Sequence, residues 1–263
     1  MRDIDREFEA EMEELVERIS QSDLQSEYEW EGEAPRKAGR CTPAGTRVGT
    51  FTCTDSDRAN IENLLSMSIP VPTLRSAVES AAGAAVSLTT AAAASLDRPA
   101  RTAASRAAFC AAFGVAPEFV PPWRATLRGV VKWRDLGELV AIRLRDVAKI
   151  LDGGCIHYFA WGSPGHCPEC TEDPPTYFAC SSFRGLYIIC LGPGFWQAWQ
   201  VRDTVTLDLT LLHEALHIYF STTVAHQGRT GNAFCYESFI SRINRLPVPQ
   251  VTTQACPLGV CAR

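Results

Sequence analysis

The chain has 263 residues, 46% of them hydrophobic, and a formal net charge of −5. This composition is ordinary for a globular protein and does not indicate a fibre or a membrane protein. No lysine and arginine cluster is visible, which argues against nucleic-acid binding. The one long stretch of low charge, residues 77–96, is too rich in Ala, Ser and Thr to predict a membrane span.

The first part of the chain is acidic. Residues 1–33 carry thirteen acids and three arginines, so residues 34–263 carry a balance of +5. Apolar residues recur at three- and four-residue steps between Ile4 and Ile19, which predicts an amphipathic helix over residues 1–20. Aromatic, Gly, Pro and Arg residues follow to about Gly49. We therefore expect residues 1–50 to form an acidic helix and linker, partly disordered, that serves as a solvated tail or a docking segment.

The remaining chain divides into an Ala-rich helical segment, residues 51–100, and a compact domain, residues 101–263. The helix of the first segment is expected from about Leu74 onward. In the second we expect helices over 101–113, 136–151, 206–223 and 232–246, and strands over 156–161, 177–180 and 186–191. This order of helices and strands predicts an α+β fold.

Two features of the sequence point to different compartments. The start of the chain is charged and lacks the apolar core of a signal peptide, so we expect no secretory signal and synthesis in the cytoplasm. The chain nevertheless has eleven cysteines, more than a reduced cytoplasmic protein needs. Export by a non-classical route, without a cleavable signal, would reconcile the two, as would metal binding by some of the thiols.

The segment His213-Glu214-Ala215-Leu216-His217 carries the strongest chemical signal. Residues i and i+4 share one face of a helix, so both imidazoles can reach one tetrahedral Zn²⁺. Glu214 is then placed as the general base for a zinc-activated water. Leucines and aromatic residues flank the motif, as expected of a buried active-site helix. The alternative is a pair of ordinary core histidines on a buried helix.

A catalytic zinc site needs a third protein ligand and an open position. The metzincin pattern would place a histidine where this chain has Thr223. His226 lies nine residues after His217, where a loop can fold back onto the metal. A glutamate on the following helix, Glu237, is the other candidate, and the spacing leaves both open.

Three short motifs in order resemble the aspzincin family of metallopeptidases, which comprises the deuterolysins and the peptidyl-lysine metalloendopeptidases. They are Cys190-Leu-Gly-Pro-Gly-Phe-Trp196, the His-Glu-x-x-His segment, and Asn232-Ala-Phe-Cys-Tyr-Glu-Ser-Phe239. The resemblance covers about residues 155–245 and is that of a divergent, bacterial-type member. It implies a zincin-like metallopeptidase domain with a small sheet, a zinc-binding helix and a C-terminal helix.

The chain departs from this family at three functional positions. The aspartate that is the family's third ligand falls about where His226 stands, so the resemblance implies three histidines on the zinc. The family's transition-state tyrosine would lie near Arg229, which leaves Arg229 or Tyr236 as the oxyanion partner. The two acids that bind the substrate lysine in lysine-specific members correspond to Phe234 and Glu237, so one of them is lost.

Cysteines near the motif favour disulfides over a second metal site. The run His166-Cys167-Pro168-Glu169-Cys170 would begin a structural zinc site only if Cys180 and Cys190 completed it, and a single Cys-x-x-Cys is a weak signal. The family that the chain resembles uses disulfides in this region. We also expect Cys256 and Cys261 to close a short loop near the C-terminus.

The sequence thus predicts a zinc-dependent endopeptidase that hydrolyses peptide or protein substrates, delivered outside the cell as an effector or toxin. The alternative is a zincin-like module that has lost activity and serves as a binding or structural component. The acidic first segment resembles, in composition only, segments of proteins associated with contractile injection particles. Such a particle is accordingly a candidate partner.

Overall fold

The computed structural model describes residues 49–120, 133–162, 167, 177–182, 187–220 and 231–256. The fold of these residues is α+β, mostly helical with a small four-stranded mixed sheet, as the sequence predicts. The predicted acidic helix over residues 1–20 lies outside them. The elements are β1 (Thr50–Thr52), α2 (Asp55–Leu65), α3 (Val71–Ser95), η1 (Arg98–Ala100), α4 (Ala103–Phe113), α5 (Leu136–Asp152), β2 (His157–Phe159), β3 (Ala179–Ser182), β4 (Ile188–Leu191), α6 (Pro193–Gln200), α7 (Thr204–Phe220), α8 (Ala233–Ile243) and α9 (Gln250–Ala255).

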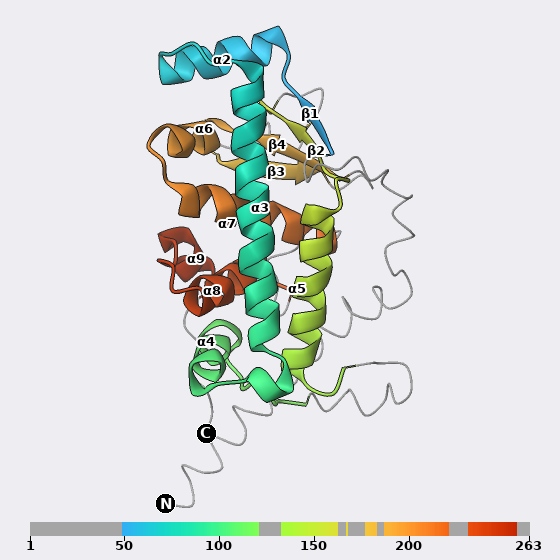
Figure 1. Ribbon diagram of the computed structural model, residues 1–263. Coiled ribbons are helices and arrows are strands. Elements are labelled where there is room, and N and C mark those ends of the chain that lie inside the picture. Colours follow the sequence, from blue (N-terminus) through green and yellow to red (C-terminus); the bar gives the residue numbers. More distant parts are fainter. Residues whose placement is uncertain are drawn as a thin grey trace, which may run out of the picture.

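Helix α3 runs through the middle of the molecule, and α5 lies along it (Figure 1). Its sequence is rich in alanine, the residue with the highest helix propensity. Ala81, Ala82 and Ala85 are buried, and their small side chains let α5 and α7 approach closely. The Ala-rich segment therefore shares one hydrophobic core with the later helices. In the described part of the chain, no helix is both long and apolar enough to cross a membrane.

The sheet has the strand order β1-β2-β4-β3. The pairs β1–β2 and β2–β4 are parallel, and β3 pairs with β4 in the antiparallel sense, with Cys180 opposite Cys190. Helix α6 follows β4 directly, and its Trp196 is fully buried and donates a hydrogen bond to the carbonyl of Ala160 at 2.7 Å. This contact fixes α6 against the end of β2.

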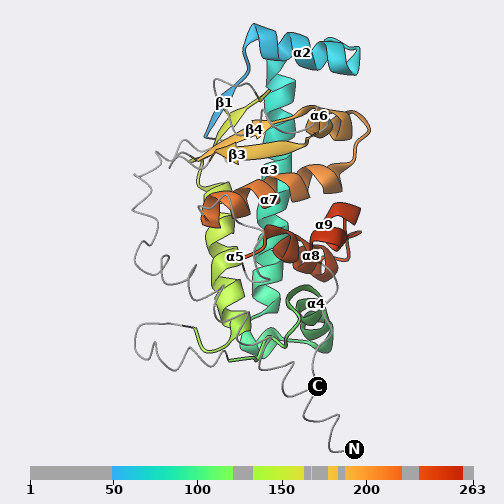
Figure 2. The same cartoon turned by 180° about the vertical axis from the view of Figure 1, so that it is seen from behind.

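Helix α7 lies between the sheet on one side and α8 and α9 on the other, as both views show (Figures 1 and 2). It packs against α3, α5, α6, β3 and α8. This position in the middle of the core explains why its sequence is so rich in leucine. The described elements therefore place the His-Glu-x-x-His segment on a helix that is held from several sides.

Five of the described elements were not expected from the sequence. They are β1, α2, η1, α6 and α9. Strand β1 is three residues long and pairs with β2, so its own sequence carries little signal. Helix α2 begins at a capping box, in which Thr54 accepts a hydrogen bond from the Asp57 N–H and Asp57 accepts one from the Thr54 N–H.

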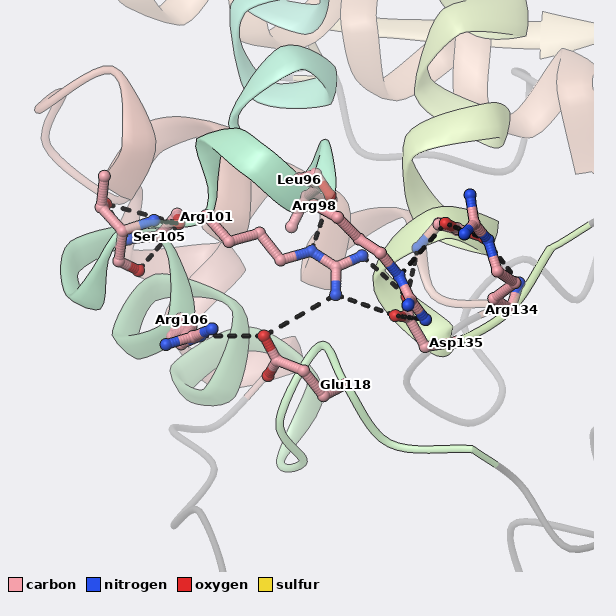
Figure 3. A network of polar contacts seen from close by, with 10 residues as sticks. Leu96, Arg98, Arg101, Ser105, Arg106, Glu118, Arg134 and Asp135 are labelled. Carbon is pink, nitrogen blue, oxygen red and sulfur yellow. Dashed lines mark hydrogen bonds and ion pairs between the residues drawn. The ribbon is translucent and has the colours of Figure 1, made fainter.

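A buried ion pair ties the end of α3 to the start of α5 (Figure 3). Arg101 donates two hydrogen bonds to Asp135, at 2.7 and 2.9 Å, and one to the carbonyl of Leu96 at 2.7 Å. Asp135 also caps α5 by accepting the N–H of Glu138 at 2.9 Å. A Cβ at Gly137 would lie 2.7 Å from Arg101 Nη2, so this glycine makes room for the guanidinium group. Since both side chains are almost fully buried, each offsets the cost of removing the other from water.

Replacing Arg101 with Met should lower the free energy of unfolding by about 3–5 kcal/mol, because it leaves a buried carboxylate without its main partner. Urea denaturation at neutral pH measures this loss. The matched control is Arg58→Met, which removes an exposed pair with Asp55 and should cost less than about 1 kcal/mol. Equal losses in the two variants would contradict the structural role of the buried pair.

Candidate active site

Helix α7 presents the predicted zinc motif on one of its faces. The helix begins after Asp203, whose carboxylate accepts hydrogen bonds from the N–H and the hydroxyl of Thr206 at 3.1 and 2.7 Å. Thr206, Thr210 and His213 are spaced by three or four residues and therefore share a face. That face lines a cavity, whereas the leucines of the other faces join the core.

The two motif histidines converge on one point. Nε2 of His213 lies 3.0 Å from Nε2 of His217, and the ring centroids are 4.7 Å apart. Two imidazole nitrogens bound to one tetrahedral zinc at about 2.0–2.1 Å would be about 3.3 Å apart. The observed separation is close to this value, so the pair fits two ligands of a single metal ion.

The other edge of the His213 ring faces a carboxylate. Nδ1 of His213 lies 3.2 Å from Oε2 of Glu237 on α8. The second oxygen of Glu237 accepts a hydrogen bond from the hydroxyl of Thr252 on α9 at 2.6 Å. Because Nδ1 and Nε2 lie on different edges of the ring, Glu237 is not placed at the meeting point of the two Nε2 atoms.

Acidic neighbours affect the pKa of His213. Burial alone would lower the pKa of His213, but the hydrogen bond to Glu237 and the charges of Glu214 and Glu237 outweigh it and raise the pKa. Glu214 is only 7% exposed and lies on the wall of the cavity. A metal ion must displace protons from such a site, so its binding depends on pH.

A cavity of about 380 Å³ opens beside His213 and Glu214. Its walls come from the start of β3, from α7, from α8 and from the segment around α9, and most of the lining surface is apolar. The Phe234 ring is part of this wall, with its centroid 4.4 Å from that of His213. The lining residues are Phe178, Ala179, Thr206, Leu209, Thr210, His213, Glu214, Phe234, Glu237, Pro249, Gln250, Val251 and Thr252.

Tyr236 lies apart from this cavity. Its side chain is fully buried, and its hydroxyl accepts a hydrogen bond from Nη1 of Arg143 at 3.3 Å. Arg143 belongs to α5, and its guanidinium carbon lies 5.7 Å from the centroid of the Phe220 ring. The other candidate oxyanion partner, Arg229, lies outside the described residues.

The structure thus brings together five of the eight site residues expected from the sequence. These are His213, Glu214, His217, Phe234 and Glu237. His226, the expected third ligand, also lies outside the described residues. Among those that are described, no three His, Cys, Asp or Glu side chains form a group that would hold a metal ion.

Thr252 and Phe178 are the parts of the site that sequence reasoning missed. Thr252 belongs to a short helix with no clear periodic signal, and Phe178 lies just before strand β3. Their roles depend on tertiary contacts between distant segments. For Thr252, the only hint in the sequence is that Cys256 follows it closely.

The C-terminal wall of the cavity is linked covalently to α8. Cys256 forms a disulfide with Cys235, so the expected pairing of Cys256 with Cys261 is wrong. Asn232 supports the same link, because its amide donates to the carbonyl of Ala255 at 3.3 Å. The physical reason is that α9 folds back along α8, which brings two cysteines 21 positions apart to a Cα–Cα distance of 5.2 Å.

Disulfides also occur on the strand side of the site. Cys167 is bonded to Cys190 of β4, which agrees with the expectation that disulfides prevail over a structural zinc site here. Cys110, Cys155 and Cys180 are disulfide-bonded as well, and Cys53 is a free thiol.

No protein-family model, curated protein or solved structure matches the chain, so the proposal for its function rests on this geometry.

Replacing Cys235 and Cys256 together with Ala should lower the free energy of unfolding by about 3 kcal/mol, the loop-closure contribution expected for a loop of this length. Urea denaturation of the oxidised proteins measures the change. Cys53→Ala is the control, because Cys53 is not in a disulfide. A double variant as stable as this control would show that the disulfide does not hold α9 in place.

Asp208 makes a pH-dependent contribution to stability. Partial burial and the negative charge of Asp203 raise its pKa to about 7. Its stabilising contribution is therefore present below the unfolded pKa, about 4, and is lost as pH rises through about 7. Asp208→Asn should thus have a higher melting temperature than the unaltered protein at pH 8, with little difference at pH 4. Asp55→Asn, at an exposed site, is the control. Its melting temperature should change between pH 4 and pH 8 by the same amount as that of the unaltered protein.

Proposed function

We propose that this chain is a zinc-dependent endopeptidase with a zincin-like catalytic domain of the aspzincin type. The observation that carries the proposal is the convergence of the two Nε2 atoms of His213 and His217, with a carboxylate behind the first ring. Two neutral imidazoles can also share one proton across this 3.0 Å contact, so the support for zinc comes from the contact together with the open cavity and Glu214 beside it. His226 is proposed as the third ligand.

Each residue of the site has a separate task in this proposal. A zinc ion held by His213, His217 and His226 would supply an activated water and polarise the substrate carbonyl. Glu214, on the cavity wall, would serve as general base toward that water and as general acid toward the leaving amine. The apolar wall excludes bulk water and holds a substrate side chain next to the scissile bond.

The edge of the sheet offers a place for the substrate backbone. Strand β3 packs against α7 and pairs with β4, and its first residue lines the cavity. A peptide in extended conformation can add to such an edge through main-chain hydrogen bonds. This arrangement favours a polypeptide substrate over a small molecule.

The disulfides support action outside the reducing cytoplasm. Cys167–Cys190 ends on β4 and Cys235–Cys256 joins α8 to the end of α9, and such bonds persist in oxidising compartments. We accordingly propose that the protein works as an exported effector. Its docking to a contractile particle through residues 1–50 remains part of the same proposal, although these residues lie almost wholly outside the described ones.

The purified protein should contain about one zinc ion per chain and cleave an unfolded protein substrate. Glu214→Gln should keep the zinc and lose at least about 100-fold in cleavage rate, because proton transfer by the side chain is lost. Glu79→Gln, a half-exposed change on α3, is the control and should behave like the unaltered protein.

Metal analysis and a cleavage assay separate the possible outcomes. Absence of zinc at neutral pH would contradict both the ligand assignment and the activity. Zinc binding without cleavage would favour the inactive binding module instead. Full activity of Glu214→Gln would contradict the assigned mechanism.

A further inference from the structure

A chain of hydrogen bonds links three secondary-structure elements behind the histidine pair. The Thr252 hydroxyl donates to Oε1 of Glu237 at 2.6 Å, and Oε2 of Glu237 lies 3.2 Å from Nδ1 of His213. The first distance is in the range of a hydrogen bond to an ionised carboxylate. Both oxygens of Glu237 thus have partners within the protein.

The residues of this hydrogen-bond network are shielded from water. Glu237 is 5% exposed and Thr252 is 1% exposed, so solvent offers little replacement for either contact. A buried carboxylate that loses a hydrogen-bond donor is destabilised and tends to reorient. The Thr252 hydroxyl therefore determines where Glu237 can direct its other oxygen.

The carboxylate in turn determines the state of the imidazole. An acceptor at Nδ1 favours the tautomer with the proton on Nδ1, and it restricts rotation of the ring. In that tautomer the lone pair of Nε2 points toward His217. A metal ligand oriented in this way needs no rearrangement before it binds.

We propose that Glu237 and Thr252 are positioning residues, which hold the His213 ring in the tautomer and orientation that turn Nε2 toward His217. This role rests on the zinc function proposed above. It differs from the two roles that the sequence suggests for Glu237, a third metal ligand or a lysine-binding group. It also gives a function to α9, which carries Thr252 and is fixed to α8 by the Cys235–Cys256 disulfide.

Zinc affinity of the full chain, measured by competition with a chelator of known affinity, tests the proposal. Thr252→Val keeps the shape of the side chain and removes the hydroxyl, and it should weaken zinc binding by about 10-fold. Glu237→Gln should weaken it by about 10–100-fold. Thr252→Ser keeps the donor and should restore affinity to within about 3-fold, an order-of-magnitude bound on the same effect.

The matched control is Thr253→Val, on the same helix. Thr253 is exposed, and its hydroxyl donates to the carbonyl of Pro249 rather than to Glu237. It should leave zinc affinity unchanged. A folded Thr252→Val protein that binds zinc as tightly as this control would overturn the positioning role while leaving the proposed function intact.

A second measurement needs no substitution and no metal. In the metal-free protein, ¹⁵N chemical shifts of the histidine rings report the tautomer at a pH where both rings are neutral. The proposal requires His213 to carry its proton on Nδ1, and a proton on Nε2 would overturn it. If the unaltered protein binds no zinc, the proposed function fails, and this tautomer alone decides whether Glu237 orients the ring.

Discussion

The burial of α7 determines which way the side chains of the His-Glu-x-x-His segment can point. One face of the helix carries leucines that join the core, and the opposite face carries Thr206, Thr210 and His213 along the cavity. Turning the helix by one residue, about 100°, would bring imidazoles into the core and leucines to the cavity. Each leucine exposed in this way would cost about 2 kcal/mol. Packing against α3 and the sheet therefore fixes the direction of the histidines before any metal binds.

A second constraint comes from the C-terminal part of the fold. Helix α8 supplies Glu237 and Phe234, and α9 supplies Gln250, Val251 and Thr252 to the cavity wall. Six residues make a helix too short to be stable alone. The disulfide to Cys235 and the hydrogen bond from Asn232 supply the tertiary support that α9 needs. Helix α7 therefore determines where the histidine side chains point, and α9 supplies part of the cavity wall beside them.

The long periodic helices and the short strands β2, β3 and β4 were predictable from the sequence, whereas β1 and α2 were not. The helices around Leu144, Leu212 and Phe239 show clear apolar spacing, and the structure has helices there within a few residues of the expected limits. Strand β1 depends on pairing with a distant segment, which no local pattern reveals. Helix α2 did have a local signal, the capping box at Thr54 and Asp57, but the helix of residues 51–100 was expected to begin only near Leu74.

In the candidate site, features set by local helix geometry were predictable from the sequence, and features set by tertiary packing were not. The spacing of His213 and His217 sufficed to place both rings on one face, because helix geometry alone determines it. The partner of Glu237 could not be read from the sequence, since it depends on how α8 and α9 pack. For Cys256 the nearer cysteine was the wrong partner, because the fold brings a more distant one into contact.

The surroundings of Glu237 also bear on substrate choice. A lysine side chain in the cavity would need a carboxylate to compensate for the loss of water around its ammonium group. Both oxygens of Glu237 already have protein partners, and the other wall residue on α8 is the aromatic Phe234. Phe178, Leu209 and Val251 offer apolar surface instead. Binding an apolar side chain would gain about 25 cal/mol per Å² of buried surface without breaking any of these contacts. Under the proposed peptidase function, the cavity would therefore favour an apolar substrate residue over lysine.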